Sequence, residues 1–167
     1  PRPPSTPSLA VQCGELASKG VELPADLATT DQLHLSAGIS YSDAEYEALN
    51  ELVSGRLVSR AGNRPINMPT TTFNASALYS LDSVPVTFGA FIRHASGFYT
   101  DNANSIFVRG HWLLDASVSY RLTEAVSLSV RGRNLTDAFY GEYSGYPSTN
   151  IYIGAPRGVD VTLTARF

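Results

Sequence analysis

Three histidines and one cysteine are the residues of this chain that could bind a metal ion: His34, His94, His111 and Cys13. Structural zinc sites draw on pairs of Cys or His separated by about two to five residues. None of the four has such a neighbour, and a single cysteine cannot form an internal disulfide. We therefore expect no metal site, no cofactor and no disulfide framework.

The signatures of catalysis and of nucleic-acid binding are also missing from the sequence. No serine lies in a G-x-S-x-G motif, and there is no glycine-rich phosphate loop. The 167 residues carry a formal net charge of -3, and no basic stripe is available to neutralise phosphates. We expect neither an enzyme nor a nucleic-acid partner.

Four charged residues lie on the polar side of strictly alternating segments: Arg93, Asp115, Arg131 and Arg133. The turn at residues 123–124 joins two of these segments. Only pairings whose residue numbers sum to an even value keep both apolar sides together, because a one-residue slip reverses every side chain. The tightest such pairing sets Asp115 opposite Arg131, and the next sets it opposite Arg133. Both predict an ion pair, worth roughly 0.2–1 kcal/mol across a strand pair.

Seven segments alternate apolar and polar residues with the period of two that is typical of a half-buried strand. Most are longer than the 5–6 residues usual in globular proteins and near the 9–11 that a tilted membrane strand needs. The first segment is the weakest and shortest. The segments are residues 15–23, 31–43, 71–81, 84–99, 110–122, 124–137 and 154–167.

Short and long connections alternate between these segments. The short ones lie near 25–30, 82–83 and 123–124, and the long ones near 42–69, 98–110 and 137–156. This asymmetry, together with aromatic residues at strand ends, is typical of an up-and-down membrane barrel. A soluble sandwich or lipocalin-like barrel alternates in the same way and stays the alternative.

One segment carries helical signals. Residues 42–57 begin with Ser42 in an N-cap position, continue with acidic residues and include Gly55 as a stop. We predict one short helix inside the first long connection.

Five stretches, in this order, resemble the barrel of TonB-dependent outer-membrane receptors: GELASKGVEL, LHLSAGISYSDAEYE, HWLLDASVSYRL, VRGRNLTDAFYGEY and GAPRGVDVTLTARF. The resemblance runs from about residue 14 to residue 167. It implies an all-β, antiparallel transmembrane barrel of 22 strands, of which about seven lie here as its C-terminal part. The plug domain would lie outside this sequence. Residues 1–13 do not match these motifs, and we predict an irregular Pro-rich start.

The family resemblance implies active transport of a scarce nutrient, such as an iron–siderophore complex or cobalamin, across the bacterial outer membrane. The implied partners are outer-membrane lipid, the TonB energy-coupling complex acting through the missing plug, the barrel assembly machinery and a siderophore-like substrate. A soluble ligand-binding β-barrel or an outer-membrane enzyme barrel are the alternatives. The enzyme would need a Ser/His/acid cluster on one rim, which the sequence does not suggest.

The resemblance and the chemistry of the side chains both suggest roles for single residues. The terminal aromatic Phe167 is expected to be an assembly signal, supported by Val159, Val161 and Leu163. The four charged residues above are expected to face the lumen. We expect Asn134 and Asp137 to cap a loop. Four tyrosines of the last long connection either contact substrate or pack among themselves: Tyr140, Tyr143, Tyr146 and Tyr152.

The predicted barrel assigns each side of the strands to an environment. Lipid-facing side chains are expected at Leu35, Ile39, Phe88, Leu114, Val118, Leu128 and Leu163, and lumen-facing side chains at Ser36, Arg93, Ser117, Ser129 and Thr162.

Overall fold

A computed structural model of the chain describes residues 14–166, which form strands and connections without a helix. Accordingly, none of these residues belongs to a helix long and apolar enough to cross a membrane. The long strands are β1 (Gly14–Ala28), β2 (Leu33–Val53), β4 (Thr71–Ser80), β5 (Val86–Ala95), β8 (His111–Arg121), β9 (Val126–Arg133) and β12 (Gly158–Ala165). The short strands are β3 (Arg56–Ser59), β6 (Phe98–Tyr99), β7 (Phe107–Val108), β10 (Gly141–Ser144) and β11 (Ile151–Ile153).

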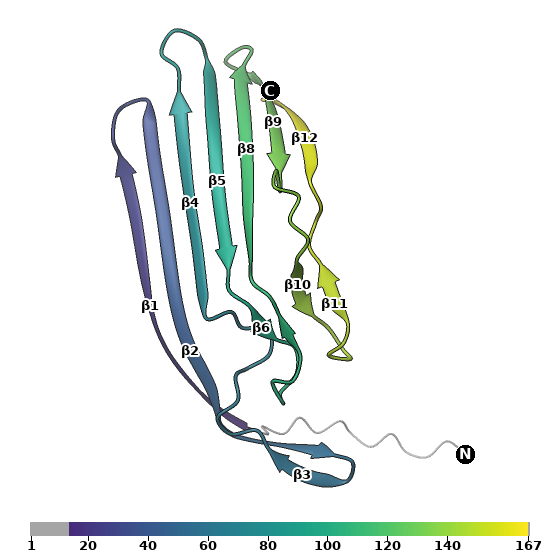
Figure 1. Cartoon of the computed structure of the whole chain (residues 1–167). Helices are drawn as coiled ribbons and strands as arrows, with labels where there is room; N and C mark the ends of the chain where they lie inside the picture. Colours follow the sequence, from purple (N-terminus) through teal and green to yellow (C-terminus); the bar gives the residue numbers. More distant parts are fainter. Residues whose placement is uncertain (1–13, 167) are drawn as a thin grey trace, which may run out of the picture.

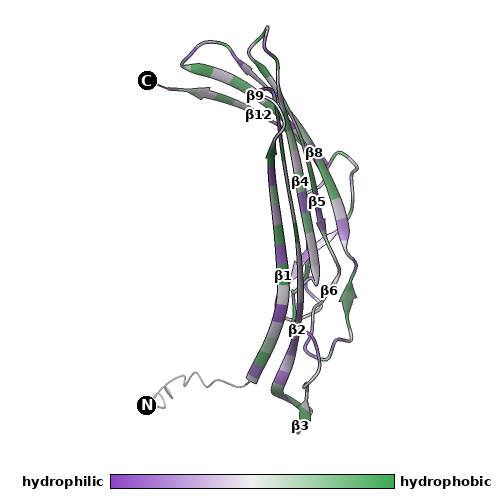
Figure 2. Ribbon diagram, turned by 90° about the vertical axis from the view of Figure 1, so that its left-hand side faces the viewer, coloured by the Kyte–Doolittle hydropathy of each residue, from purple (hydrophilic) through white to green (hydrophobic). Residues whose placement is uncertain are grey.

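The seven long strands form one antiparallel sheet in the order β1-β2-β4-β5-β8-β9-β12 (Figure 1). Seen from the side, the sheet is a single curved layer, along whose strands hydrophobic and hydrophilic residues alternate (Figure 2). Three short turns share one end of the sheet with the end of β12, and three long connections share the other. These long connections are residues 54–70, 96–110 and 134–157. The seven predicted strands and the one-sided loops are confirmed.

Strand register separates the two faces of the sheet. Hydroxyl groups pair across neighbouring strands on one side, as in Ser36–Ser76 at 2.7 Å and Ser119–Ser129 at 2.9 Å. We call this side the polar face. Apolar residues pair across the other side, as in Phe88 opposite Val118, and this is the apolar face. The two predicted sets of lipid-facing and lumen-facing residues lie on these opposite faces.

The apolar face is largely uncovered. Its large side chains remain exposed, including Leu23, Leu27, Ile39, Phe88, Ile92, Val118, Val159, Val161 and Leu163. In the described part of the chain the buried apolar side chains are Ala44, Phe98, Val108 and Leu113, which gather towards the long connections. A sheet in water covers its apolar face with a second layer, so this face is suited to an apolar environment.

The predicted helix at residues 42–57 is wrong, because β2 continues to Val53 and turns directly into β3. Ser54 and Gly55 have φ values of 51° and 78°, as a two-residue hairpin turn with two positive φ angles requires. Residues 34–49 pair with β1, and residues 50–53 pair with β3. These ladder hydrogen bonds outweigh the modest helix propensity of the acidic residues.

The first strand was predicted too short. β1 has 15 residues, because it pairs with β2 over nearly its whole length. Pro24 lies inside β1, opposite Gly38, and does not end the strand. Among the described strands β1 pairs with β2 alone, and a strand with an unpaired edge tolerates a proline.

Candidate functional site

Two rows of aromatic residues bound the apolar face. Near the long connections, the Trp112 ring stacks on His94 with centroids 4.3 Å apart and meets Phe73 at 5.9 Å. Near the short turns, Tyr79 and Tyr120 are exposed on the same face. Trp112 and Tyr120 lie on one strand, so the rows are roughly 27 Å apart at the usual rise per residue. The apolar band of a membrane barrel has about this height.

A buried carboxylate organises the polar face. Asp115 on β8 is 1% exposed, and its Oδ2 accepts from Arg131 Nη2 at 2.7 Å and lies 3.4 Å from Arg93 Nη2. Its Oδ1 accepts from the backbone N–H of Asn134 at 2.9 Å. The carboxylate therefore joins three elements: β5, β9 and the start of the third long connection.

The predicted ion pair between Asp115 and an arginine is confirmed, but through the wider of the two registers. Tyr120 pairs with Leu128, which aligns Asp115 with Arg133 and makes its contact with Arg131 diagonal. The tightest register fails because Thr123 holds a three-residue turn. Its Oγ1 accepts from the N–H of Val126 at 3.0 Å, while the N–H of Leu122 donates to the carbonyl of Val126 at 2.9 Å.

Two further residues, Arg133 and Phe91, lie beside Asp115 on the polar face. Arg133 pairs with Asp160 of β12 instead of Asp115. The Phe91 ring, which sits on the polar face opposite Asp115, has the Arg131 guanidinium 5.4 Å from its centroid. The contact of Arg93 with Asp115 was missed from sequence, because a long connection between β5 and β8 does not set their register.

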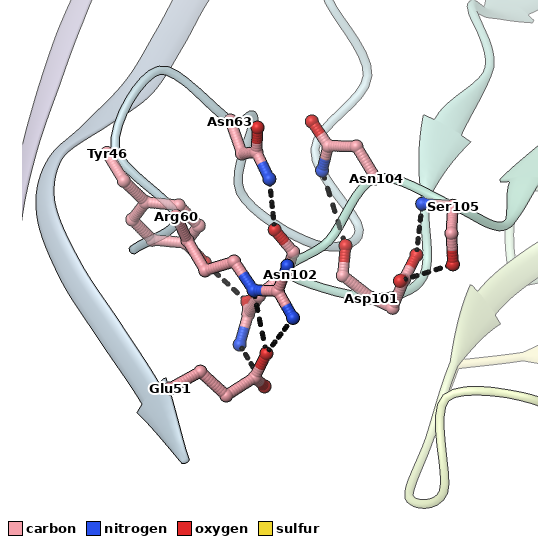
Figure 3. A network of polar contacts seen from close by, with 8 residues as sticks. All are labelled: Tyr46, Glu51, Arg60, Asn63, Asp101, Asn102, Asn104 and Ser105. Carbon is pink, nitrogen blue, oxygen red and sulfur yellow. Dashed lines mark hydrogen bonds and ion pairs between the residues drawn. The ribbon is translucent and has the colours of Figure 1, made fainter. Parts of the chain in front are cut away.

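The first and second long connections are tied together by polar contacts around Glu51 at the end of β2 (Figure 3). Arg60 donates to the Glu51 carboxylate at 2.9 Å, and Asn102 Nδ2 donates to it at 3.3 Å. Asn102 also accepts from the Tyr46 hydroxyl at 2.9 Å and, through its carbonyl, from Asn63 at 2.7 Å. The extended β2–β3 hairpin is thereby fixed to the second connection.

The second connection is itself held by Asp101. Its carboxylate accepts from the N–H groups of Ser105 and Ile106 at 2.9 and 3.0 Å and from the Ser105 hydroxyl at 2.7 Å. Burial alone would raise the pKa of Asp101, but these hydrogen bonds outweigh it and lower the pKa. Beside it, the Asn104 side chain exchanges hydrogen bonds with the backbone of Arg64 at 2.8 and 2.9 Å.

Asn67 joins the third connection to the other two. Its side chain donates to the carbonyl of Ser144 at 2.9 Å and accepts from the Ser144 N–H at 2.7 Å and hydroxyl at 2.9 Å. Its own N–H donates to the carbonyl of Tyr99 at 2.9 Å. Ser144 and the adjacent Thr100 are buried. The three long connections therefore form one packed body, which we call the loop body.

The candidate tyrosines are divided between packing and exposure. Tyr140 stacks on His111 with centroids 4.2 Å apart, and Tyr143 stacks on Tyr152 at 4.5 Å. Tyr146 is 97% exposed. Three of the four thus stack on another ring, although Tyr143 and Tyr152 remain about half exposed, and Tyr146 is the most exposed of the set.

The predicted loop cap is confirmed. The Asn134 side chain donates to the carbonyls of Ala138 and Ala155 at 2.9 and 3.1 Å and accepts from the Ala138 N–H at 2.9 Å. Asp137 accepts from the N–H of Arg157 at 3.2 Å. These contacts hold the two ends of the third connection together.

The last strand, β12, carries the residues predicted to act in assembly. Val159, Val161 and Leu163 share the exposed apolar face of β12, while Phe167 lies outside the described residues. Their role in assembly stays a prediction. Over residues 14–166 no three His, Cys, Asp or Glu side chains gather to hold a metal ion.

Comparisons with known proteins agree with this architecture. A family model described as "TonB dependent receptor-like, beta-barrel" matches residues 2–135, including most of the Pro-rich start that the motifs left out. The chain is 28% identical over 165 residues to the ferrichrome outer membrane transporter/phage receptor of Escherichia coli K12, covering 95% of this chain and 21% of that protein. It is 30% identical over 159 residues to the ferrioxamine receptor of Yersinia enterocolitica, covering 92% and 21%.

Among solved structures, the chain superimposes on the siderophore receptor PiuA from Acinetobacter baumannii with a TM-score of 0.81 and 26% identity. The match covers 91% of this chain and 22% of that one. The chain therefore spans about a fifth of the length of the relatives it matches.

Proposed function

Because this chain belongs to the TonB-dependent receptor family, we propose that it forms part of the wall of an outer-membrane receptor that imports iron–siderophore complexes. The named relatives are receptors or transporters for ferrichrome and ferrioxamine. Residues 14–167 would supply the C-terminal strands of a 22-stranded barrel, and residues 1–13 lie outside the described residues. The receptor would lie in the bacterial outer membrane and act in transport, without catalysis.

The single observation that carries this proposal is the uncovered apolar face between two aromatic rows. Its exposed side chains match a lipid environment, and the spacing of the rows matches the apolar band of a membrane barrel. The polar face carries hydroxyl pairs and charges suited to a wet lumen.

The open edges of the sheet support a larger barrel. Among the described residues, the outer edges of β1 and β12 pair with no other strand. In lipid each unpaired backbone group costs several kcal/mol, so spanning sheets close on themselves. We infer that further strands complete the wall on both sides.

The partners follow from this arrangement. Lipid would contact the apolar face, and the loop body would form part of the outer entrance for a siderophore-like substrate, with Tyr146 the most accessible of the four tyrosines. TonB would supply energy through a plug that the barrel encloses. The assembly machinery would read the end of β12 through Phe167, Val159, Val161 and Leu163.

A chimera tests the proposal directly. This chain replaces the matching fifth of the E. coli ferrichrome transporter, and the folded, heat-modifiable form is quantified in outer-membrane fractions. We expect folded chimera in that fraction. Aggregation in the periplasm, while the parent transporter assembles normally, would contradict membership of such a wall.

Matched variants of the chimera test the assembly role of β12. Val161→Ser with Leu163→Ser should lower the folded fraction, whereas Thr162→Ala with Thr164→Ala on the opposite face should not. Equal losses would show that β12 has no assembly signal on its apolar face.

Spin labels test which face meets lipid. Labels on cysteines at Leu114 and Val118 should be quenched by a lipid-soluble reagent, and labels at Ser117 and Ser129 by a water-soluble one. The reverse pattern would overturn the assignment of both faces.

A further inference from the structure

The part of the polar face formed by β5, β8, β9 and β12 holds more positive than negative charge. Two acidic residues of the same face, Glu22 and Asp26, lie on β1 and are separated from β5 by β2 and β4. On β5, β8, β9, β12 and the residue after β12, register places five arginines and two aspartates on this face. They are Arg93, Arg121, Arg131, Arg133, Arg166, Asp115 and Asp160. The whole chain has a net charge of -3, so the excess is local to this part of the sheet.

The excess is concentrated at Asp115. Arg93 and Arg131 share one carboxylate oxygen, and the remaining oxygen is taken by the N–H of Asn134. One negative charge therefore serves two guanidinium groups. Their side chains are 57% and 45% exposed, respectively, and each guanidinium has five N–H donors in a planar fork.

A pocket of about 230 Å³ opens beside these two arginines. Asn74 lies opposite Arg93 across β4 and β5, and the Arg131 guanidinium lies over the Phe91 ring. The hydroxyl pair Ser36–Ser76 also lines the pocket. Two guanidinium groups, an amide and hydroxyls converge there, and all of them can donate hydrogen bonds.

We infer that the pocket between Arg93 and Arg131 binds a carboxylate group that the described residues do not supply. A second carboxylate would balance the second guanidinium and could accept hydrogen bonds from the N–H groups that do not contact Asp115. This inference rests on the proposed function, since the pocket would lie in the lumen. The carboxylate comes either from an acidic side chain of a protein segment enclosed by the barrel or from a free ligand.

A double-mutant cycle separates the external carboxylate from Asp115. In the complete receptor that carries this chain, Asp115→Asn removes the internal charge and leaves Arg93 and Arg131 close together. If an enclosed acidic side chain occupies the pocket, adding Arg93→Gln to Asp115→Asn lowers the melting temperature further. If the pocket is empty, the same change relieves repulsion between two cations and leaves the melting temperature equal or higher.

Citrate serves as the probe for a free carboxylate. It should bind the wild-type receptor and the Arg121→Gln control alike, and bind Arg93→Gln about tenfold more weakly, the loss expected for one charged hydrogen bond. No citrate binding, together with no loss of melting temperature in the cycle, overturns the inference. If the Asp115→Asn barrel does not assemble, melting of Arg93→Gln and Arg121→Gln is compared directly. Equal melting and no citrate binding then overturn it.

The proposed function and the carboxylate site can be contradicted separately. A receptor absent from the outer membrane contradicts the proposed function. A receptor that assembles and transports iron, yet shows neither effect at Arg93, contradicts only the carboxylate site.

Discussion

Replacing Asp115 with alanine should destabilise the barrel more than any other single change to a charged residue of the sheet. The carboxylate is almost fully buried and accepts hydrogen bonds from β9, from β5 and from the backbone of Asn134. Asp115→Ala deletes all three contacts at once. Its effect can be estimated from the surroundings of each donor.

The largest part of the cost comes from the N–H of Asn134, a residue that is itself buried. An orphaned buried donor costs about 1–3 kcal/mol. The bond from Arg131 is charge-assisted and contributes about 1.5–3 kcal/mol in a buried setting, but Arg131 is half-exposed and regains water. We therefore expect a loss of about 2–4 kcal/mol. Asp115→Asn keeps an oxygen for Asn134 and should lose about half as much.

The assay is urea unfolding of the complete receptor in phospholipid, with the free energy of unfolding as the readout. Asp160→Asn is the matched control, because it removes an aspartate that pairs with Arg133 on the same face but stays exposed. Solvent screens such a pair, so its loss should be small. A loss for Asp115→Ala no larger than that for Asp160→Asn would refute the reasoning from burial.

Three further outcomes are expected, all within the long connections. Burial raises the pKa of Asp101, but its hydrogen bonds lower the pKa below 3.8 overall. The ionised carboxylate therefore stabilises the second connection fully above pH 3.8, and this stabilisation is lost as the pH falls through the lowered pKa of the folded state. Amide exchange at 98–110 should show this dependence, and Asp101→Asn should abolish it. Asn67→Ala should speed proteolysis in both the first and third connections, whereas Asn150→Ala, which bonds only within its own hairpin, should affect the third alone. Gly55→Ala should cost about 1 kcal/mol at its positive φ, seen as faster exchange confined to β2 and β3, and a change spread over the main sheet would argue against a local effect.

The strands and faces could be predicted because alternation is a local property of the sequence. The polarity of each residue indicates the face on which it lies. Paired residue numbers must then sum to an even value across a short turn, so that the apolar sides of both strands lie on the same face. The exact register could not be predicted, since it depends on how Thr123 closes its turn. The helix prediction failed for a similar reason: local signals at Ser42 and Gly55 carried no information about the neighbouring strands that pair with this segment.

Apart from the cap at Asn134 and Asp137, the contacts that join the long connections into the loop body could not be predicted. Its main contacts join residues that stand far apart, such as Asn67 with Ser144 and Glu51 with Asn102. Asparagine is common in loops, and its presence does not name a partner. Likewise, Leu113 is an apolar residue on the polar face that is buried, and the sequence does not show which residues cover it.

The long strands follow one another in the sheet in the same order as along the chain. This order affects how the barrel wall folds and how it can change in evolution. Among the long strands, each pairs only with those that precede and follow it in the sequence, so the repeating unit of the sheet is the hairpin. Hairpins closed by short turns, β1–β2, β4–β5 and β8–β9, bring few residues together and have the smallest loop-closure entropy cost. We expect them to form before the pairs joined by long connections, in an order that pulse-labelling of backbone amides can resolve. A gene can therefore gain or lose the segment for one hairpin without changing how the remaining strands pair, because long strands that are neighbours in the sheet are also neighbours in the sequence.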